Sequence, residues 1–219
     1  MRSALRMLYK NLIFPKVVGR PFFYTSFVAT VDGKVYVNKN GYWPIGSRTD
    51  YEAFTNLRAH ADAIIDGKNT ALRFAKNTIE TVHSESFKKT RQEFGKINTP
   101  QYIIVTKHPD EALQAAIKNP YVFTPVILKD IQDVISYLQK EQLQNIFVDG
   151  GPQLLGSFFE NDLIDEVFLT ISPRIFGNSE NAAITMVEGK LFPPDKIKLE
   201  VISMERAENE VFLRYKVLH

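Results

Sequence analysis

Three short segments of the chain join glycine or hydroxyl side chains to positive charge, which is the chemistry of phosphate binding. Residues 149–151 are Asp-Gly-Gly, residues 67–70 are Gly-Lys-Asn-Thr, and residues 106–108 are Thr-Lys-His. Glycine lets backbone amides approach a phosphate closely, and a helix N-terminus or a lysine adds positive potential. Each segment alone is also explained as an ordinary turn with a solvated lysine. The three together suit a dinucleotide, which has two phosphate regions.

Other nucleotide and metal chemistries are disfavoured by what the sequence lacks. No Gly-x-Gly-x-x-Gly follows an apolar strand and no Walker loop is present, which disfavours a standard Rossmann domain and a P-loop enzyme. The chain contains no cysteine, which excludes disulfides, thiolate metal sites and a zinc deaminase module. We therefore expect no metal, and we expect a reducing cytoplasm as the compartment.

The overall charge and hydropathy predict a small-molecule partner. The formal net charge of +2 is too small to predict nucleic-acid binding by electrostatics. No apolar run approaches the length that crosses a bilayer, so we expect no membrane segment. A small anionic ligand is compatible with both observations.

Strands and helices that would position these segments alternate along the second half of the chain. The pattern predicts strands at 101–106, 125–128, 145–148 and 165–172, with helices at 110–117, 131–140 and 153–159 between them. Strands joined by single helices predict a mostly parallel sheet covered on both faces. Ligands of such sheets bind beyond the carboxyl ends of the strands, where the three segments fall.

The first part of the chain predicts a hairpin and a helix. Residues 22–31 and 34–37 have the composition of a strand and a short returning strand, joined by a tight turn at Asp32-Gly33. Ser47 has the position of the cap in a capping box, which predicts a helix to about residue 59.

Later segments predict a short strand, an irregular stretch and a second hairpin. Residues 61–65 form an apolar run that predicts a buried strand. Residues 73–98 show weak periodicity and predict a surface excursion, with a helix around 86–94. Residues 196–204 and 210–217 alternate with period two, which predicts an antiparallel hairpin at the sheet edge.

The N-terminus differs from the rest in charge. Five basic residues precede the first acidic one, Asp32, and Leu5, Leu8 and Leu12 fall at helical spacing. This predicts a packed leader helix over residues 1–19, followed by a single domain over residues 20–219. A transit peptide is the alternative, against which the stretch is poor in serine.

Four longer stretches are similar to one known family. Residues 20–34, 57–70 and 147–155 look like its three hallmark segments, and residues 163–177 match it as well. The family resembled is that of the pyrimidine reductases of riboflavin biosynthesis, the C-terminal half of the bacterial bifunctional deaminase-reductase. The resemblance implies an α/β fold like that of dihydrofolate reductase: a central, mostly parallel sheet flanked by helices, with a C-terminal antiparallel hairpin.

The resemblance also implies an activity and a cofactor. The activity is NADPH-dependent reduction of the ribose of a 5-amino-6-(5-phosphoribosylamino)uracil-type pyrimidine to a ribityl chain, carried out by a homodimer. Deamination in the pathway would be carried out by another protein. Residues 67–70 are similar to the Gly-Arg-x-Thr loop of dihydrofolate reductases, and residues 106–108 fall where that fold holds the adenosine 2′-phosphate. The implied cofactor-binding residues are Thr30, Gly67, Lys68, Asn69, Thr70, Thr106, Lys107, His108, Asp149, Gly150, Gly151, Gln153 and Leu154.

For the substrate side, the resemblance implies Lys34, Gly46, Ser47 and Arg58 as binding residues. Lys34 with Arg58 would bind the phosphate, and Asp32 is the nearby candidate for proton delivery as a catalytic residue. The chain departs from the family pattern at two places. Residues 72–75 replace an acidic pair and proline found in many members, and Asp149 replaces the usual glutamate. The exact substrate therefore stays open.

Two alternatives remain open on these residues. Asp50 and Glu52 lie at the start of the first helix, where a folate site carries an acidic residue, so a dihydrofolate-reductase-like pterin reductase is one alternative. The departures at residues 73–75 and Asp149 motivate the other, a non-catalytic nucleotide-binding protein on the same fold.

Overall fold

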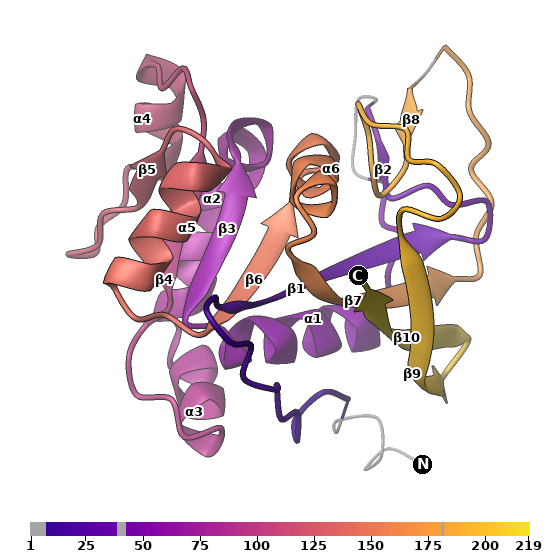
Figure 1. Cartoon of the computed structure of the whole chain (residues 1–219), viewed down its shortest axis with the longest axis horizontal. Helices are drawn as coiled ribbons and strands as arrows, with labels where there is room; N and C mark the ends of the chain where they lie inside the picture. The colour runs from indigo at the N-terminus through magenta and orange to yellow at the C-terminus, as the bar shows by residue number, and fades with distance from the viewer. Residues whose placement is uncertain (1–7, 39–42, 181) are drawn as a thin grey trace.

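One eight-stranded sheet runs through the computed structural model, which describes residues 8–38, 43–180 and 182–219 (Figure 1). In spatial order its strands are β5 (Val126–Leu128), β4 (Gln101–Val105), β3 (Ala63–Gly67), β6 (Asn145–Gly150), β1 (Phe22–Thr30), β7 (Ile164–Ser172), β10 (Glu210–Leu218) and β9 (Lys198–Ala207). The strands from β5 to β7 are parallel, whereas β10 is antiparallel to β7 and β9 to β10. The predicted mostly parallel sheet with a C-terminal antiparallel hairpin is confirmed.

Helices cover both faces of this sheet. They are α1 (Arg48–His60), α2 (Lys68–His83), α3 (Glu85–Glu93), α4 (Glu111–Ile117), α5 (Ile131–Lys140) and α6 (Pro152–Glu160). Side chains of α1 to α4 pack into one core cluster and those of α5 and α6 into a second. Successive strand residues divide between the clusters as the pleat requires: Tyr24 and Ile64 lie in the first, Phe23 and Ile65 in the second. Burying each such side chain contributes roughly 1.5–3 kcal/mol.

The predicted hairpin of β1 with the next strand is wrong. The turn forms, because Gly33 N donates to Thr30 O at 2.8 Å and Thr30 N to Lys34 O at 2.9 Å. However, β2 (Tyr36–Val37) pairs with β8 (Ala183–Ile184) in a separate two-stranded sheet. β1 pairs instead with β7 over residues 23–30 and with β6 over residues 22–25.

The predicted surface excursion over residues 73–98 is also wrong, although its helix around 86–94 is confirmed as α3. Most of the first part of the excursion belongs to α2, which buries Ala71, Ala75, Ile79 and Val82 against the first cluster. Alanine carries little hydrophobicity, and the exposed Leu72 and Phe74 lie off the buried stripe. The helical period was therefore present in the sequence but weak.

The predicted leader helix is wrong over residues 8–19, while its first seven residues lie outside the described ranges. Residues 8–11 form a turn, and residues 12–17 have no regular structure. Tyr9 has a φ of 61°, which interrupts a right-handed helix. The segment packs instead through aromatic contacts: Tyr9 meets Phe168 edge-on at 4.8 Å, and Phe14 stacks on Tyr24 at 4.4 Å.

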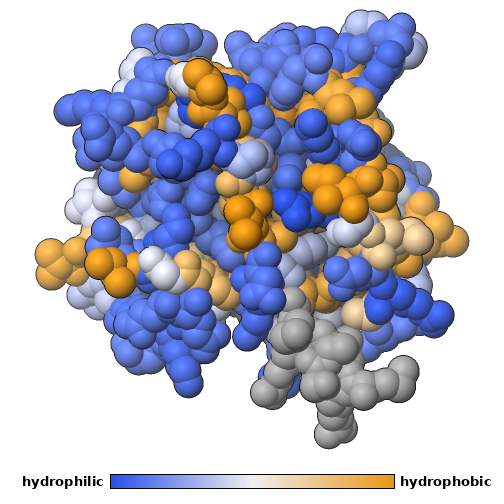
Figure 2. Space-filling view, turned by 60° about the horizontal axis from the view of Figure 1, so that its bottom comes forward, coloured by the Kyte–Doolittle hydropathy of each residue, from blue (hydrophilic) through white to orange (hydrophobic). Residues whose placement is uncertain are grey.

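The surface in Figure 2, which brings forward the side at the bottom of Figure 1, is mostly hydrophilic, with apolar residues in separate groups. None of the helices in the described ranges has the length and apolar character needed to cross a bilayer.

Candidate cofactor and substrate site

The three segments with phosphate-binding chemistry lie side by side. They follow β3, β4 and β6, and β3 lies between the other two strands. Gly67 at the end of β3 is paired with Val105 at the end of β4, and Asp66 is paired with Gly150 at the end of β6. Because all three strands are parallel, their carboxyl ends meet at one edge of the sheet.

Two glycine turns lie in close contact at this edge. A Cβ atom on Gly151 would lie 2.8 Å from Thr70 Oγ1, and one on Gly67 would lie 3.5 Å from Leu154 Cβ. Gly150 has a φ of +144°, and the peptide bond between Gly150 and Gly151 is cis. Any larger residue at position 151 would displace the Thr70 side chain. Because the residues at both turns are glycines, no side chain of theirs covers the backbone there.

The helices that begin at these turns differ from the others at their N-termini. Ser47, Ser84, Asp110 and Asp130 cap α1, α3, α4 and α5 with side-chain oxygens. The cap positions of α2 and α6 are Gly67 and Gly151, for which no hydrogen bond from a described side chain is present. Unsatisfied N–H groups and the positive end of the helix dipole make such N-termini suitable for an anion.

Lys68 joins two of the segments through its side chain. Its Nζ donates to His108 O at 2.8 Å and to Asp110 Oδ2 at 2.5 Å. The bond from Lys68 is the main cause that lowers the pKa of Asp110. Part of the Lys68 charge is therefore matched by Asp110, whereas the side chains of Lys107 and His108 are exposed.

The remaining predicted cofactor residues surround the same edge. Thr106 Oγ1 accepts from His108 N at 3.1 Å, which shapes the turn after β4. Asn69 and Gln153 are exposed, and Leu154 is half-buried against the second cluster. Thr30 is buried, and its Oγ1 donates to Asp32 Oδ1 at 2.6 Å, so its hydroxyl holds a turn.

Next to this edge lies an uncovered part of the sheet. β1 is paired with β7 over residues 23–30 but with β6 only over residues 22–25, and Ser26, Phe27 and Val28 in its carboxyl half are only half-buried. Tyr24 faces α1, because its hydroxyl donates to Leu57 O at 2.9 Å. Ser26 and Val28 share that face by alternation. The face of β1 toward α1 is therefore partly exposed in the carboxyl half of the strand.

Two of the predicted substrate residues, Gly46 and Ser47, lie at the N-terminus of α1. Ser47 N and Oγ donate to the two carboxylate oxygens of Glu210 at 2.9 and 2.5 Å, and Ser47 Oγ accepts from Asp50 N at 3.2 Å. A Cβ atom on Gly46 would lie 2.2 Å from Asp50 Oδ2. Lys34 is half-buried in the turn after β1, and its N donates to Thr30 Oγ1 at 2.9 Å.

The hydrogen bonds that Asp32 accepts favour its ionised form. It accepts from Thr30 Oγ1, and from the backbone N–H groups of Phe176 at 3.2 Å and Gly177 at 2.7 Å. The Thr30 bond, followed by these backbone bonds, lowers the pKa of Asp32. An acid with a lowered pKa carries no proton at neutral pH, so these contacts argue against the predicted proton-delivery role. Asp32 ties the turn after β1 to residues 176–177.

Arg58 is not available to a substrate phosphate, which corrects that prediction. Its guanidinium is buried, forms an ion pair with Asp149, donates to Thr78 Oγ1 at 3.2 Å and stacks over Phe54 at 4.3 Å. Asp149, predicted to bind the cofactor, accordingly turns its side chain inward, where it is 7% exposed. Burial lowers the pKa of Arg58, but Asp149 outweighs burial and raises it overall.

Sequence reasoning missed the buried acid next to this pair. Asp66 is fully buried and accepts from Tyr102 OH at 2.6 Å. Burial, and then the charge of Asp149, raise the pKa of Asp66 well above its usual range. Arg58 Nε and Asp66 Oδ1 are buried with no hydrogen-bond partner among the described residues. The available signal was an aspartate directly after Ile64 and Ile65 in an apolar strand.

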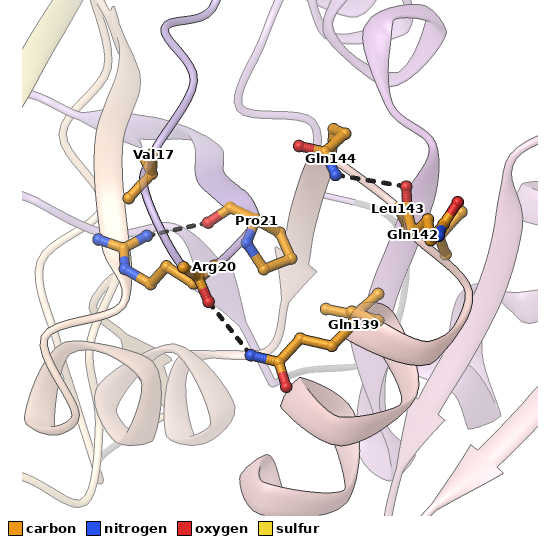
Figure 3. Close-up of a pocket in the computed structure, with 9 residues that line it drawn as sticks. Val17, Arg20, Pro21, Gln139, Gln142, Leu143 and Gln144 are labelled. Carbon is orange, nitrogen blue, oxygen red and sulfur yellow. Dashed lines mark hydrogen bonds between the residues drawn. The ribbon is translucent and has the colours of Figure 1, made fainter.

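A pocket of about 460 Å³ lies at the amino ends of the strands, opposite the glycine turns (Figure 3). Pro21 and Gln144, two of its lining residues, directly precede β1 and β6. Gln139 Nε2 donates to Gly19 O at 3.2 Å across it, and Arg20 is paired with Asp165. The pocket is thus remote from the carboxyl ends of the strands. Within the described ranges, no cluster of three or more histidine, aspartate or glutamate side chains suits a metal ion.

Comparisons with known proteins found relatives of the sequence and of the fold. A family model described as the RibD C-terminal domain matches residues 21–213. The chain is 24% identical over 198 residues to the 2,5-diamino-6-ribosylamino-4(3H)-pyrimidinone 5′-phosphate reductase of Archaeoglobus fulgidus, a match that covers 79% of this chain and 89% of that protein.

Two solved structures resemble the fold. A pyrimidine reductase-like protein of Corynebacterium diphtheriae has a TM-score of 0.67 at 18% identity, with 98% of each chain covered. Dihydrofolate reductase of Enterococcus faecalis has a TM-score of 0.52 at 12% identity, with 90% of this chain and 96% of that chain covered. The predicted dihydrofolate-reductase-like fold is confirmed.

Proposed function

The chain belongs to the RibD C-terminal domain family, and from that premise we propose that it is an NADPH-dependent reductase of riboflavin biosynthesis. Its substrate is a phosphorylated ribosylamino-pyrimidine, the class named for the Archaeoglobus fulgidus relative, and its product carries a ribityl chain. The observation that carries the proposal is the pair of uncapped helix N-termini, α2 and α6, at the carboxyl ends of adjacent strands. We propose the cytoplasm as the compartment.

The residues at the carboxyl edge suit NADPH. The amides at the N-termini of α2 and α6 would hold the pyrophosphate, with Thr70 between the two turns. The exposed Lys107 and His108 would meet the 2′-phosphate. The nicotinamide supplies the hydride, and the protein binds, orients and excludes water.

The direct test is a turnover assay at 340 nm (the absorbance of reduced nicotinamide) with four pairings. The diaminopyrimidine and the deaminated uracil form of the ribosylamino phosphate are each supplied with NADPH and with NADH, and dihydrofolate serves as the comparison substrate. We expect turnover of a pyrimidine phosphate with NADPH. Turnover of dihydrofolate alone would establish the pterin reductase instead, and binding of NADPH with no turnover of any substrate would support a non-catalytic protein.

Lys107→Ala should weaken NADPH binding several-fold and leave NADH binding unchanged, because only NADPH carries the extra phosphate. Lys68→Ala should act in the same direction but less, since Asp110 already matches part of its charge. Calorimetric titration with both cofactors measures the difference. Lys118→Ala is the matched control, because Lys118 is exposed just beyond α4, the helix that follows the Lys107 turn. Equal losses for NADPH and NADH would refute the 2′-phosphate assignment.

We also propose a homodimer formed through β9. This strand is the last of the sheet, so its outer backbone groups face no other described strand. Leu199, Val201, Ile202 and Met204 along it are 43%, 57%, 44% and 70% exposed. An exposed, apolar edge strand readily pairs with a second copy.

Replacing Ile202 and Met204 together by lysine should convert the dimer to a monomer while leaving the fold intact, because both side chains are already exposed. Sedimentation velocity measures the mass of each species. Leu191→Lys is the control, since Leu191 is 97% exposed and lies outside the sheet. A double variant that remains dimeric, or a wild-type protein that is monomeric, would contradict the proposal.

A further inference from the structure

An ion pair bridges the carboxyl ends of two adjacent strands. Lys68 begins α2 directly after β3, whereas His108 and Asp110 lie between β4 and α4. The Nζ atom of Lys68 donates to Asp110 Oδ2 at 2.5 Å and to His108 O at 2.8 Å. Because β3 and β4 are paired in parallel up to Gly67 and Val105, this side chain ties the turn after β4 to the start of α2.

Both oxygens of the Asp110 carboxylate are engaged. Oδ1 accepts from Leu113 N at 3.0 Å and caps α4, while Oδ2 accepts from Lys68. The bond from Lys68, followed by the bond from Leu113, lowers the pKa of Asp110. The group is therefore held as a carboxylate in one place, at the turn after β4.

This carboxylate limits what an anion gains at the turn. Residues 68 and 106–111 carry two lysines and two acids, and Lys107, Asp110 and Glu111 are exposed. A phosphate that approached Lys68 would have to replace Asp110, because the ammonium group already has an anionic partner. The phosphate would then lie close to a carboxylate of the same sign, and juxtaposed like charges oppose binding.

We propose that Asp110 is a specificity-determining residue that sets the preference between NADPH and NADH. This inference rests on the proposed function, which brings the 2′-phosphate of NADPH to the turn after β4. Asp110 competes with that phosphate for Lys68 and repels it. The 2′-hydroxyl of NADH is uncharged and can donate a hydrogen bond to a carboxylate. Asp110 thus narrows the preference for NADPH that Lys68 and Lys107 create.

The test removes the charge and keeps the helix cap. Asparagine caps a helix as well as aspartate does, and once its oxygen accepts from Leu113 N, its amide group offers Lys68 only a donor. Asp110→Asn should therefore release Lys68 and lower the Kd for NADPH about two- to fivefold, the range of an exposed ion pair. The Kd for NADH should not decrease. Calorimetric titration measures both values, and Asp110→Ser, with another capping residue, repeats the measurement.

Two adenosine fragments locate the effect. Adenosine 2′,5′-bisphosphate carries the extra phosphate without the nicotinamide, and adenosine 5′-monophosphate lacks both. Asp110→Asn should tighten the first and not the second. In a Lys68→Ala background the gain should be smaller, because no ammonium group is left to be released.

Asp130→Asn is the matched control. Asp130 caps α5 in the same way, since its Oδ1 accepts from Asp133 N at 3.1 Å, and it forms no ion pair within the described ranges. Its replacement should leave both Kd values unchanged. An equal gain for NADPH in Asp130→Asn would attribute the effect to net charge and overturn the role of Asp110.

The remaining outcomes separate this inference from the reductase proposal. If Asp110→Asn binds NADPH no tighter than the wild type, or tightens NADPH and NADH equally, Asp110 does not set the preference. The reductase proposal then stands, provided that the wild-type protein binds NADPH. A wild-type protein that binds neither cofactor overturns both.

Discussion

Arg58→Ala should lower the free energy of unfolding by about 3–5 kcal/mol, the usual cost of removing one partner of a buried ion pair. The guanidinium is the cation paired with Asp149, and Asp66 lies beside them with an oxygen that has no partner among the described residues. Alanine would leave the Asp149 carboxylate in the interior without compensation. Urea denaturation followed by circular dichroism measures the loss.

A matched control for Arg58 is available on the same helix. Arg48 is 88% exposed and paired with Glu52, so Arg48→Ala should change stability by no more than about 0.5 kcal/mol. The double variant Arg58→Ala with Asp149→Ala should be less destabilised than the sum of the single variants, because neither charge is then left alone. If Arg58→Ala costs no more than Arg48→Ala, the pair is not the buried element described above.

Gly151→Ala should raise the Kd for NADPH at least about tenfold, which corresponds to about 1.4 kcal/mol. The added methyl group would lie 2.8 Å from Thr70 Oγ1, closer than packing allows, and it would cover backbone that the phosphates are proposed to approach. Quenching of protein fluorescence by NADPH measures the Kd. The loss should appear equally for NADH, because both cofactors carry the pyrophosphate.

Two further variants separate the causes of that loss. Thr70→Ala combined with Gly151→Ala removes the hydroxyl that the methyl group would meet. If this double variant binds NADPH like the wild type, the collision with Thr70 rather than blocked phosphate access explains the effect. Gly95→Ala is the control for an alanine remote from the glycine turns, since Gly95 follows α3 and a Cβ atom there would meet nothing within 4 Å. Wild-type affinity in Gly151→Ala would contradict the proposed pyrophosphate corner.

Most of the fold was predictable because its signals are local. The regular alternation of strands and helices after residue 100, the cap at Ser47 and the period-two pattern of the C-terminal hairpin all appear in the structure. The failures share a different cause. The partner of β2 is β8, far along the chain, and the buried stripe of α2 includes two alanines and a threonine while the apolar Leu72 and Phe74 of the same helix are exposed.

The candidate site divides in the same way. The three phosphate-binding segments were identified from residue types alone. Glycine, lysine and threonine at a strand end can bind phosphate through their own backbone and side-chain groups, without a partner distant in sequence. The contacts of Arg58 and Asp32 were not, since each depends on partners distant in sequence. Arg58 is paired with Asp149, 91 positions away, and Asp32 accepts from the backbone N–H of Gly177.

The sequence by itself determined the α/β class, the parallel sheet and the three loops with phosphate chemistry, because periodicity and glycine placement act over a few residues. Only the tertiary structure decided which charged groups are exposed at the carboxyl ends of the strands and which are buried. That choice depends on partners brought in from elsewhere in the chain: Asp149 pairs with Arg58 inside the protein, and the backbone N–H of Gly177 binds Asp32.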